Sequence, residues 1–252
     1  MSLNGKVALV TGAGRGIGRE VALALAERGV TSALVARSGH ELSETARLVE
    51  GRGGKTLALV ADLADPAALA TTVDRAVSAL GPIGILVNNA ATVEPLGPSA
   101  GMDPTTWASS LGINVIAPAS LAFALLPAMV QAGWGRIVNV SSIVVAHPAA
   151  MIGGNAYATT KAALEAHTAN LAAELAGTGV TANTYRPGSV DTAMQELVRT
   201  KGSGRVSEET HARFVHNHEK KTLITPQRSA LSLVARLTSD ASGQIWDASD
   251  PL

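Results

Sequence analysis

A short apolar segment that runs through four closely spaced glycines into a helical segment constrains this chain more than any other feature. Lys6–Val10 (KVALV) is rich in valine and leucine, which is typical of a buried strand. Thr11–Gly18 (TGAGRGIG) follows, and Arg19–Arg28 has the composition of a helix. A strand, a glycine turn and a helix in this order present backbone N–H groups and the positive end of a helix dipole. The sequence therefore predicts a phosphate-binding turn near its beginning.

Alternating strand and helix segments continue along the chain and predict an α/β protein. A length of 252 residues suits one sizeable domain, so we expect residues 1–252 to form a single nucleotide-binding domain. Further strands are expected at Val30–Ala36, Thr56–Ala61, Ile83–Asn88, Arg136–Val140, Val180–Tyr185 and Gln244–Asp247. Further helices are expected at His40–Glu50, Pro66–Leu80, Trp107–Met129 with a break at Pro118, a long segment after Asn155, and Gln227–Asp240.

Composition excludes several classes of function. Apolar residues make up 46% of the chain, and 20 basic side chains balance 20 acidic ones, which argues against nucleic-acid or polybasic membrane binding. The absence of cysteine excludes disulfides and thiol catalysis. Met1–Gly5 has no signal-peptide pattern, and no apolar run reaches the roughly 20 residues of a membrane helix. We therefore expect a soluble cytoplasmic protein.

Residues 189–221 differ in character from the rest of the chain, because charged and small polar residues dominate there. We expect them to form a mobile insertion over a site. His216 and His218 lie in this segment, but no carboxylate pattern surrounds them, so an exposed polar surface explains them better than a metal site. No metal ion is expected.

The residues after the second strand bear on the choice of cofactor. In a dinucleotide-binding fold this strand ends beside the adenosine ribose, where a carboxylate favours NAD(H) and an arginine favours NADP(H). Positions 35–38 contain no carboxylate, whereas Arg37 follows the strand directly, next to Ser38. Arg15 lies in the glycine turn. Two cations at these positions favour NADP(H) over NAD(H), although NAD(H) remains an alternative.

Polar residues also end the third and fourth strands. Asp62 could accept a hydrogen bond from an adenine amino group, or it could cap a turn. Asn88 and Asn89 are expected to brace neighbouring strand ends through their side-chain amides. Asn114 lies in an apolar stretch, where a buried amide must find hydrogen-bond partners. We therefore expect Asn114 to have a specific role.

Tyr157 and Lys161 lie four residues apart on the long helix predicted after Asn155, so they share a face. A phenol with a pKa of about 10 is a poor acid or base at neutral pH. A neighbouring ammonium favours the phenolate and is expected to lower that pKa. The alternative is an ordinary tyrosine and lysine on an amphipathic helix, since YxxxK alone is a short pattern.

Taken together, these motifs resemble the short-chain dehydrogenase/reductase family in its compact form of about 250 residues. The glycine spacing is TGxxxGxG rather than the common GxGxxG. The resemblance implies one Rossmann-like, doubly wound parallel sheet with strand order 3-2-1-4-5-6-7 and helices on both faces. It covers nearly the whole chain, in the order Thr11–Gly18, Asp62-Leu63, Asn88-Asn89-Ala90, Asn114, Ser142, Tyr157 with Lys161, and Pro187-Gly188 followed by Thr192.

The resemblance also implies roles for individual residues. Tyr157 would be the general acid or base, and Lys161 would lower its pKa and hold the nicotinamide ribose. Ser142 would polarise the substrate oxygen, with Ser141 as a neighbouring candidate, and Asn114 would place a water next to Lys161. The implied nucleotide site comprises Thr11, Gly12, Arg15, Gly16, Ile17, Gly18, Arg37, Ser38, Asp62, Leu63, Asn89, Ala90, Tyr157, Lys161, Pro187, Gly188, Val190 and Thr192.

We therefore expect an NADP(H)-dependent oxidoreductase acting on a carbonyl/alcohol pair, such as a ketone or 3-oxoacyl-type reductase. The alternatives are an NAD-dependent alcohol dehydrogenase and a non-catalytic dinucleotide-binding regulator. The family commonly forms dimers and tetramers through the helices at 105–130 and 155–177, so a homo-oligomer is expected. Two features depart from the family pattern: the Ser142–Tyr157 connection is slightly long, and Asp247-Ala248-Ser249 replaces the usual Asp-Gly-Gly.

Overall fold

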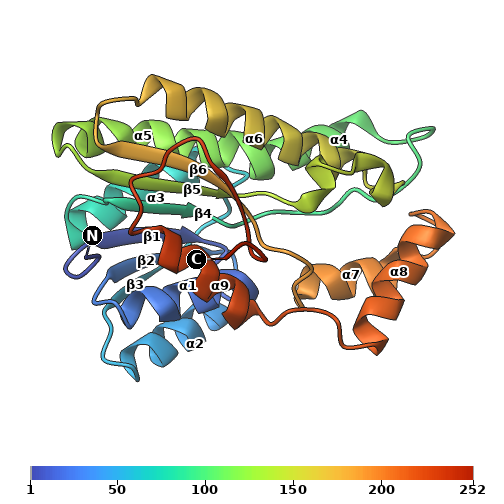
Figure 1. Ribbon diagram of the computed structural model, residues 1–252, viewed down its shortest axis with the longest axis horizontal. Helices are drawn as coiled ribbons and strands as arrows, with labels where there is room; N and C mark the ends of the chain where they lie inside the picture. Colours follow the sequence, from blue (N-terminus) through green and yellow to red (C-terminus); the bar gives the residue numbers. More distant parts are fainter. Residues whose placement is uncertain (1, 252) are drawn as a thin grey trace.

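The computed structural model describes residues 2–251 and contains a sheet of seven parallel strands (Figure 1). The strand order is β3-β2-β1-β4-β5-β6-β7, which confirms the expected doubly wound sheet. Between β1 and β4 the order reverses direction, and in such folds ligands bind at this point, outside the carboxyl ends of the strands. The strands are β1 (Val7–Thr11), β2 (Thr31–Ala36), β3 (Thr56–Val60), β4 (Ile85–Asn88), β5 (Gly135–Val140), β6 (Val180–Arg186) and β7 (Ile245–Asp247).

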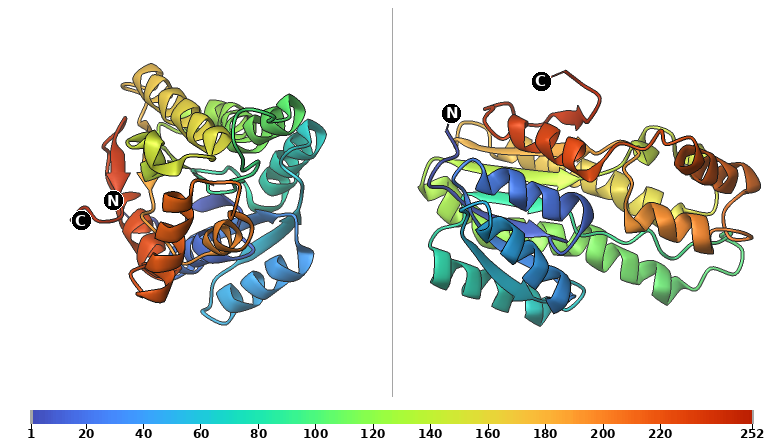
Figure 2. Two further views of the ribbon diagram at one scale, coloured as in Figure 1. Left: turned by 90° about the vertical axis from the view of Figure 1, so that its right-hand side faces the viewer. Right: turned by 90° about the horizontal axis from the view of Figure 1, so that it is seen from below.

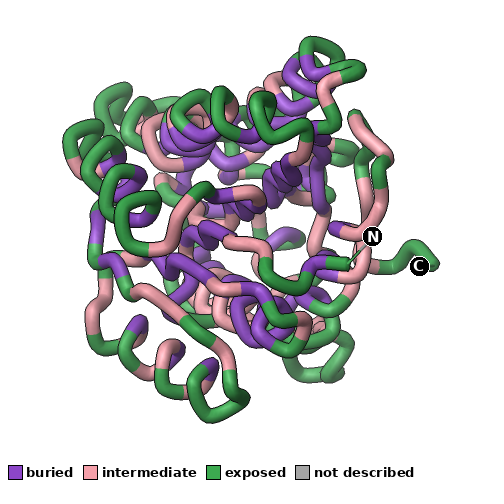
Figure 3. Tube along the Cα trace, turned by 90° about the vertical axis from the view of Figure 1, so that its left-hand side faces the viewer, coloured by how far each residue is buried: buried purple, intermediate pink, exposed green. Residues whose placement is uncertain are grey.

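Helices cover both faces of the sheet, because the central strands are apolar on both sides. The buried residues form one aliphatic cluster on each face, with the strands between them (Figures 2 and 3). One face is covered by α1 (Gly16–Ala26), α2 (Gly39–Glu50) and α9 (Pro226–Arg236). The other face is covered by α3 (Pro66–Leu80), α5 (Ala117–Gln131) and α6 (Asn155–Glu174). Most bounds agree with expectation to within two residues; the larger differences are that α1 begins inside the glycine turn, α4 begins three residues early, and α9 ends four residues early.

The helix expected to break at Pro118 continues through that residue instead. It runs as α4 (Pro104–Leu111), a π-helical segment η1 (Gly112–Ile116) and α5. Pro118 has no N–H to donate to the preceding turn, and the π-helical segment lies directly before it. A π segment widens the helix locally, and such segments are frequent at functional sites.

Residues 104–131 together form a helix long and apolar enough, by length and composition, to cross a membrane. The sequence predicts no apolar run of about 20 residues, and polar residues such as Ser109 and Asn114 do interrupt this helix. One such helix is weak evidence for a membrane span, because core helices of water-soluble proteins pass the same test. Here the helix packs against α3 and α6 over the sheet.

Residues 189–224 leave the sheet and return to it beside the carboxyl ends of the strands. They contain α7 (Ala193–Lys201) and α8 (Glu208–Glu219), which extend to the right of the sheet in Figure 1. The two ends of this segment are joined by backbone hydrogen bonds from Ile224 to Ser189 (2.9 Å) and from Asp191 to Ile224 (3.0 Å). The predicted insertion is therefore helical and has a closed base.

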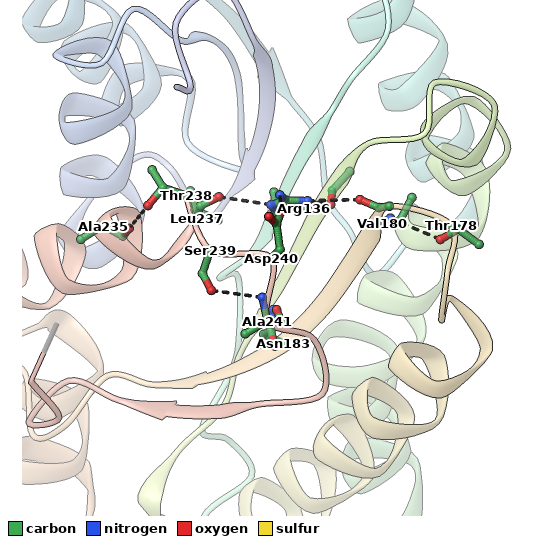
Figure 4. A network of polar contacts seen from close by, with 12 residues as sticks. Arg136, Thr178, Val180, Asn183, Ala235, Leu237, Thr238, Ser239, Asp240 and Ala241 are labelled. Atoms are coloured by element: carbon green, nitrogen blue, oxygen red, sulfur yellow. Dashed lines mark hydrogen bonds and ion pairs between the residues drawn. The ribbon is translucent and has the colours of Figure 1, made fainter. Parts of the chain in front are cut away.

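Arg136, at the start of β5, connects the chain at the amino ends of the strands. Its side chain is 2% exposed and donates to the backbone carbonyls of Leu237 (3.2 Å) and Gly179 (3.2 Å). It also forms an ion pair with Asp240, so it links β5 to the residue before β6 and to the segment after α9 (Figure 4). This cluster lies at the amino end of the strands, away from the residues predicted to bind a ligand.

Candidate active site

The glycine turn is too tightly packed for a side chain at Gly12 or Gly18. Gly12 has a φ of +64°, and a Cβ there would lie 2.8 Å from Asn89 Nδ2. A Cβ on Gly18 would lie 2.3 Å from the carbonyl oxygen of Gly12. Both contacts are shorter than real Cβ atoms allow, so glycine is required to close the turn between β1 and α1.

The start of α1 leaves its backbone N–H groups available. Arg15 is the N-cap residue, and its side chain makes no capping hydrogen bond. The first turn contains no acidic residue. The helix has 11 residues, and its N-terminus follows the glycine turn without a side-chain cap. Its partial positive charge and its free backbone N–H groups suit the diphosphate of a dinucleotide.

A groove of about 560 Å³ runs along the carboxyl ends of the strands from this turn. It brings together most of the residues that sequence analysis assigned to the nucleotide. Those lining it are Gly12, Arg15, Gly16, Ile17, Arg37, Ser38, Asp62, Leu63, Asn89, Ala90, Tyr157, Lys161, Pro187 and Thr192. Thr11 and Gly18 are buried in the turn behind the groove, and Gly188 and Val190 line the neighbouring pocket instead.

Asparagines brace the groove as predicted. Asn89 Nδ2 donates to the carbonyl oxygens of Thr11 (3.0 Å) and Gly12 (3.3 Å), while Thr11 Oγ1 accepts from the backbone N–H of Asn89 (2.9 Å). Asn88 Nδ2 donates to Asn139 Oδ1 across β4 and β5 at 2.8 Å. These bonds fix the glycine turn against the end of β4.

The end of β2 holds a carboxylate that sequence analysis did not assign. Arg37 is exposed and lines the groove, but Arg15 forms an ion pair with Glu41, with 3.2 Å between Nη1 and Oε1. Ser38 caps α2, since its hydroxyl accepts from the backbone N–H of Glu41. The spacing of Ser38 and Glu41 is that of a capping box, which predicts the start of α2 but not the contact between Glu41 and Arg15.

Asp62 caps a turn, which was one of its two predicted roles. Its Oδ1 accepts from the backbone N–H of Ala64 at 3.0 Å. The residue is exposed and lines the groove at the end of β3. A carboxylate oxygen has more than one lone pair, so the capping bond leaves this side chain able to accept from an adenine amino group as well.

Tyr157 and Lys161 lie one helical turn apart on α6 and face the sheet. The Lys161 side chain is 2% exposed, and its Nζ donates to the carbonyl oxygen of Val140 at 2.7 Å. The ammonium lies 5.9 Å from the centroid of the Tyr157 ring. Both side chains line the groove, and Tyr157 also lines the neighbouring pocket. Tyr157 therefore lies between the groove and the neighbouring pocket.

The pKa of Tyr157 differs from the expected direction. Burial raises the pKa of its phenol, and the hydroxyl of Ser142 opposes that rise by hydrogen bonding. Lys161, which was predicted to lower the pKa of Tyr157, is not among the causes of this shift. Burial lowers the pKa of Lys161 itself to about 8. Desolvation disfavours both charged forms. A phenolate at neutral pH therefore needs further positive charge close by.

Ser142 rather than Ser141 lies next to Tyr157. Ser142 lines the same pocket as Tyr157, and its hydroxyl accepts from the backbone N–H of Val144 at 3.3 Å. Ser141 is buried, and its hydroxyl donates to Glu165 Oε1 at 2.7 Å. The geometry thus separates the two neighbouring serines.

Asn114 has the hydrogen-bond partners that a buried amide requires. It lies in the π-helical segment η1 and is 0% exposed. Its Nδ2 donates to Thr160 Oγ1 (2.9 Å) and to the carbonyl oxygen of Thr92 (2.8 Å), and its Oδ1 accepts from the Thr92 backbone N–H (2.8 Å). The side chain therefore joins η1 to the Tyr157 helix and to the loop after β4.

The neighbouring pocket has a volume of about 230 Å³ and is predominantly apolar. Its walls come from the loop after β5, from Tyr157 and from the segment 189–224. The apolar lining residues are Ile17, Val93, Ile143, Val144, Ala150, Met151, Pro187, Val190, Met194, Val198 and Phe214. Polar side chains in the lining are Ser142, His147, Tyr157, Ser189, Thr192, Gln195, Arg213 and Asn217.

The long connection between Ser142 and Tyr157 forms a wall of this pocket. It contains two short 3₁₀ helices, η2 (Ile143–Val145) and η3 (Pro148–Met151). The backbone N–H of Ser207, between α7 and α8, donates to the carbonyl oxygen of Ile152 at 3.1 Å. A Cβ on Gly153 would lie 2.4 Å from the Arg205 carbonyl oxygen, so the two segments are in close contact. The extra residues thus dock the connection against 189–224.

The buried lysine makes protein stability depend on pH. The folded pKa of Lys161 is about 8, against about 10.4 in an unfolded chain. Between these values the unfolded chain binds more protons, so the free energy of unfolding should rise with pH, by up to about 1.4 kcal/mol per unit. We expect the wild type to gain stability relative to Lys161→Met between pH 8 and 10. Urea unfolding at several pH values measures this; a constant difference between the two proteins would contradict it.

Within residues 2–251, no cluster of three or more histidine, aspartate or glutamate side chains has a geometry that could hold a metal ion. His216 and His218 lie on α8, where both are exposed.

A doubly wound sheet with a phosphate-binding turn, and with a tyrosine and a lysine beside a small pocket, defines a nucleotide-dependent oxidoreductase fold. Residues 6–202 match the family model "short chain dehydrogenase". The chain belongs to the short-chain dehydrogenase/reductase family.

Similar proteins include structures determined with different nucleotides. The chain is 37% identical over 194 residues to a 3-oxoacyl-acyl-carrier-protein reductase of Pseudomonas aeruginosa, covering 77% of each chain. Among solved structures, an NAD⁺-bound xylitol dehydrogenase gives a TM-score of 0.87 at 28% identity, covering 98% of each chain. A blue fluorescent protein from a metagenomic library, in complex with NADPH, gives 0.83 at 31% identity, covering 98% of this chain and 97% of that one.

Proposed function

We propose that this protein transfers hydride between NADP(H) and a carbonyl/alcohol pair. The position of Tyr157, between the nucleotide groove and the apolar pocket, is the observation that carries the proposal. A bound nicotinamide supplies or accepts the hydride. The phenol of Tyr157 gives a proton to the carbonyl oxygen of the substrate, and the Ser142 hydroxyl holds that oxygen by a hydrogen bond.

Lys161 has two proposed tasks. Its ammonium is fixed by the Val140 carbonyl oxygen, which directs it into the groove where the nicotinamide ribose would bind. It also adds positive charge beside Tyr157, and an oxidised nicotinamide would add more. Asn114 supports both tasks indirectly, because it ties η1 to Thr160, the residue before Lys161.

NADP(H) is the proposed nucleotide because Arg37 is exposed in the groove at the end of β2, next to the N-terminus of α2. A 2′-phosphate carries nearly two negative charges and would gain charge-assisted hydrogen bonds there. Glu41 is the observation that favours the alternative, NAD(H), since it already pairs with Arg15. With two arginines and one glutamate, the local charge still favours the phosphate.

The proposed substrate is a compact ketone with a largely apolar body. The pocket beside Tyr157 has a volume of about 230 Å³ and contains no acidic side chain in its lining. Segment 189–221 would cover the substrate, because α7 and α8 contribute Met194, Val198 and Phe214 to the walls. A 3-oxoacyl group fits the same description, in line with the ketoacyl reductase among the relatives.

A screen of carbonyl compounds that follows the loss of NADPH absorbance tests this function. We expect reduction of apolar ketones or 3-oxoacyl thioesters, and much slower reduction by a Tyr157→Phe variant tested in parallel. If the protein binds NADPH but reduces no compound in a broad panel, and oxidises no alcohol with NADP⁺, a non-catalytic nucleotide-binding protein would replace the proposal.

We also propose that the protein forms a homo-oligomer through η1, α5 and α6. Ile116 and Phe123 are 55% and 59% exposed on this face, and Phe123 stacks edge-on against His167 of α6 with 5.8 Å between centroids. Small exposed residues on α6, such as Ala162 and Ala166, allow another helix to approach closely.

Light scattering at micromolar concentration should therefore give a dimer or tetramer mass. Phe123→Asp should shift that mass toward the monomer, because a charge would be buried in the contact. Val77→Asp, an equally polar change at a 40% exposed position on α3, is the matched control and should leave the mass unchanged. A monomer mass for the wild type would refute this assembly.

A further inference from the structure

Glu165 is a buried carboxylate on α6 to which the proposed function assigns no role. It follows Lys161 by one helical turn and Tyr157 by two, so the three side chains occupy one face of the helix. The residue is 9% exposed. Its carboxylate accepts three hydrogen bonds: Ser141 Oγ to Oε1 (2.7 Å), Arg186 Nε to Oε1 (2.9 Å) and Arg186 Nη2 to Oε2 (2.8 Å).

The two partners of Glu165 lie directly before two parts of the active site. Ser141 is the first residue after β5 and is followed by Ser142, the proposed donor to the substrate oxygen. Arg186 is the last residue of β6 and is followed by Pro187, which lines both the groove and the pocket. One carboxylate therefore connects the ends of β5 and β6 to the helix that carries Lys161.

Stability alone does not account for this arrangement. Burying an ion pair removes two charges from water, and apolar side chains of similar volume often stabilise a protein as well or better. The bidentate geometry, however, fixes the direction of the Arg186 guanidinium, which a packed apolar pair would not do. The pair therefore provides position and charge at this place rather than net stability.

We propose that Glu165 is a positioning residue, which holds the Ser142 and Pro187 segments in register with Lys161 and supplies the counter-charge that keeps this ammonium protonated. The proposal rests on the function proposed above for the same site. It assigns Arg186 the opposite electrostatic effect, since the guanidinium neutralises part of the Glu165 charge.

The charged groups around Lys161 come from several elements. Tyr157 and Glu165 face it from α6, the Val140 carbonyl oxygen faces it from β5, and Arg186 reaches the cluster from β6. The charge of Asp247, on β7, acts on Arg186. Burial lowers the pKa of Lys161 to about 8, and the charge of Glu165 is the influence that opposes this lowering. Loss of that charge should deprotonate Lys161 at a lower pH.

The test is the pH dependence of NADPH binding, measured by nucleotide fluorescence with the full-length protein. Because protonated Lys161 is proposed to hold the ribose, the dissociation constant should rise as pH passes the pKa of this lysine. In Glu165→Gln we expect the rise to begin at least about half a pH unit lower than in the wild type. In Arg186→Gln the rise should begin at a higher pH, because the Glu165 charge is no longer neutralised.

Glu174→Gln is the matched control, since it makes the same change at the exposed end of the same helix. Its binding profile should follow that of the wild type. If Glu165→Gln and Arg186→Gln lower the melting temperature but leave the pH profile where it is, the pair is merely structural and the proposal is overturned. Shifts in the same direction for both variants would also overturn it.

Ser141→Ala keeps the proposal testable if the charge variants fold poorly. It removes only one hydrogen bond, so we expect kcat to fall several-fold with KM nearly unchanged and with the binding profile unmoved. An unchanged kcat would contradict the positioning role. Nucleotide binding needs no turnover, so a wild type that reduces no ketone would refute the proposed function while the binding profiles still decide the role of Glu165.

Discussion

Replacing Tyr157 by phenylalanine is expected to lower turnover by a factor of about 10²–10⁴, the usual contribution of a general acid. The change removes one hydroxyl from a side chain that is 9% exposed and leaves the ring packed against Val144 and Met151. The fold and the nucleotide groove should persist, because Lys161 is fixed by a backbone carbonyl rather than by the phenol. Nucleotide affinity should therefore remain close to that of the wild type.

Tyr185→Phe provides the matched control, because it removes the same atom from the other tyrosine of the chain. The Tyr185 hydroxyl donates to the carbonyl oxygen of Ser229 (2.7 Å), and Tyr185 lines neither the groove nor the pocket, so its loss should lower stability but not turnover per folded molecule. Steady-state rates on any substrate from the carbonyl screen provide the measurement. Near-wild-type turnover by Tyr157→Phe would remove Tyr157 from the mechanism.

The second large effect concerns the nucleotide. We expect Arg37→Ala to weaken NADPH binding by about tenfold or more and to leave NADH binding nearly unchanged. A charge-assisted hydrogen bond contributes about 1.5–3 kcal/mol, and the NAD(H) ribose carries no phosphate to receive it. Dissociation constants of both nucleotides for the wild type and the variant provide the measurement.

Glu41→Gln should act in the opposite direction. It removes the carboxylate that now pairs with Arg15 at 3.2 Å, so both arginines could contact a 2′-phosphate, and NADPH binding should tighten by a few-fold. Arg15 is exposed, so this pairing is screened by solvent and costs little to break. If the wild type binds NADH as tightly as NADPH, our interpretation of Arg15 and Arg37 is wrong.

Local sequence patterns determined the framework of this protein. The alternation of strands and helices could be predicted from composition and from the spacing of apolar residues. A buried parallel strand is an unbroken apolar run, whereas the helix that follows it also contains polar residues. The glycine turn could be recognised because Gly12 and Gly18 are required for a tight backbone turn, which involves few residues outside the turn. The spacing of Tyr157 and Lys161 places them on one face of a helix by its periodicity alone.

Tertiary structure decided the features that depend on which distant segments meet. The helix irregularity falls at Gly112–Ile116 rather than at Pro118, because buried Asn114 bonds to Thr92 and Thr160 from that segment. The pKa of Tyr157 is governed by burial more than by its lysine neighbour, and burial depends on every segment packed over the site. The spacing of residues within one helix indicates neither the hydrogen bonds to distant segments nor the burial of a side chain.

The polar partners of the site residues also depend on the tertiary structure. Glu41 meets Arg15 across 26 positions, and Glu165 meets Arg186 across 21, so neither pair is visible in a local pattern. The connection after Ser142 shapes the pocket only because Gly153 and Ile152 contact the segment between α7 and α8. Charge and hydrogen bonding act over a few ångströms in space. The sequence therefore placed Tyr157 and Lys161 on one face of a helix, while the packing of remote segments determined which groups surround them.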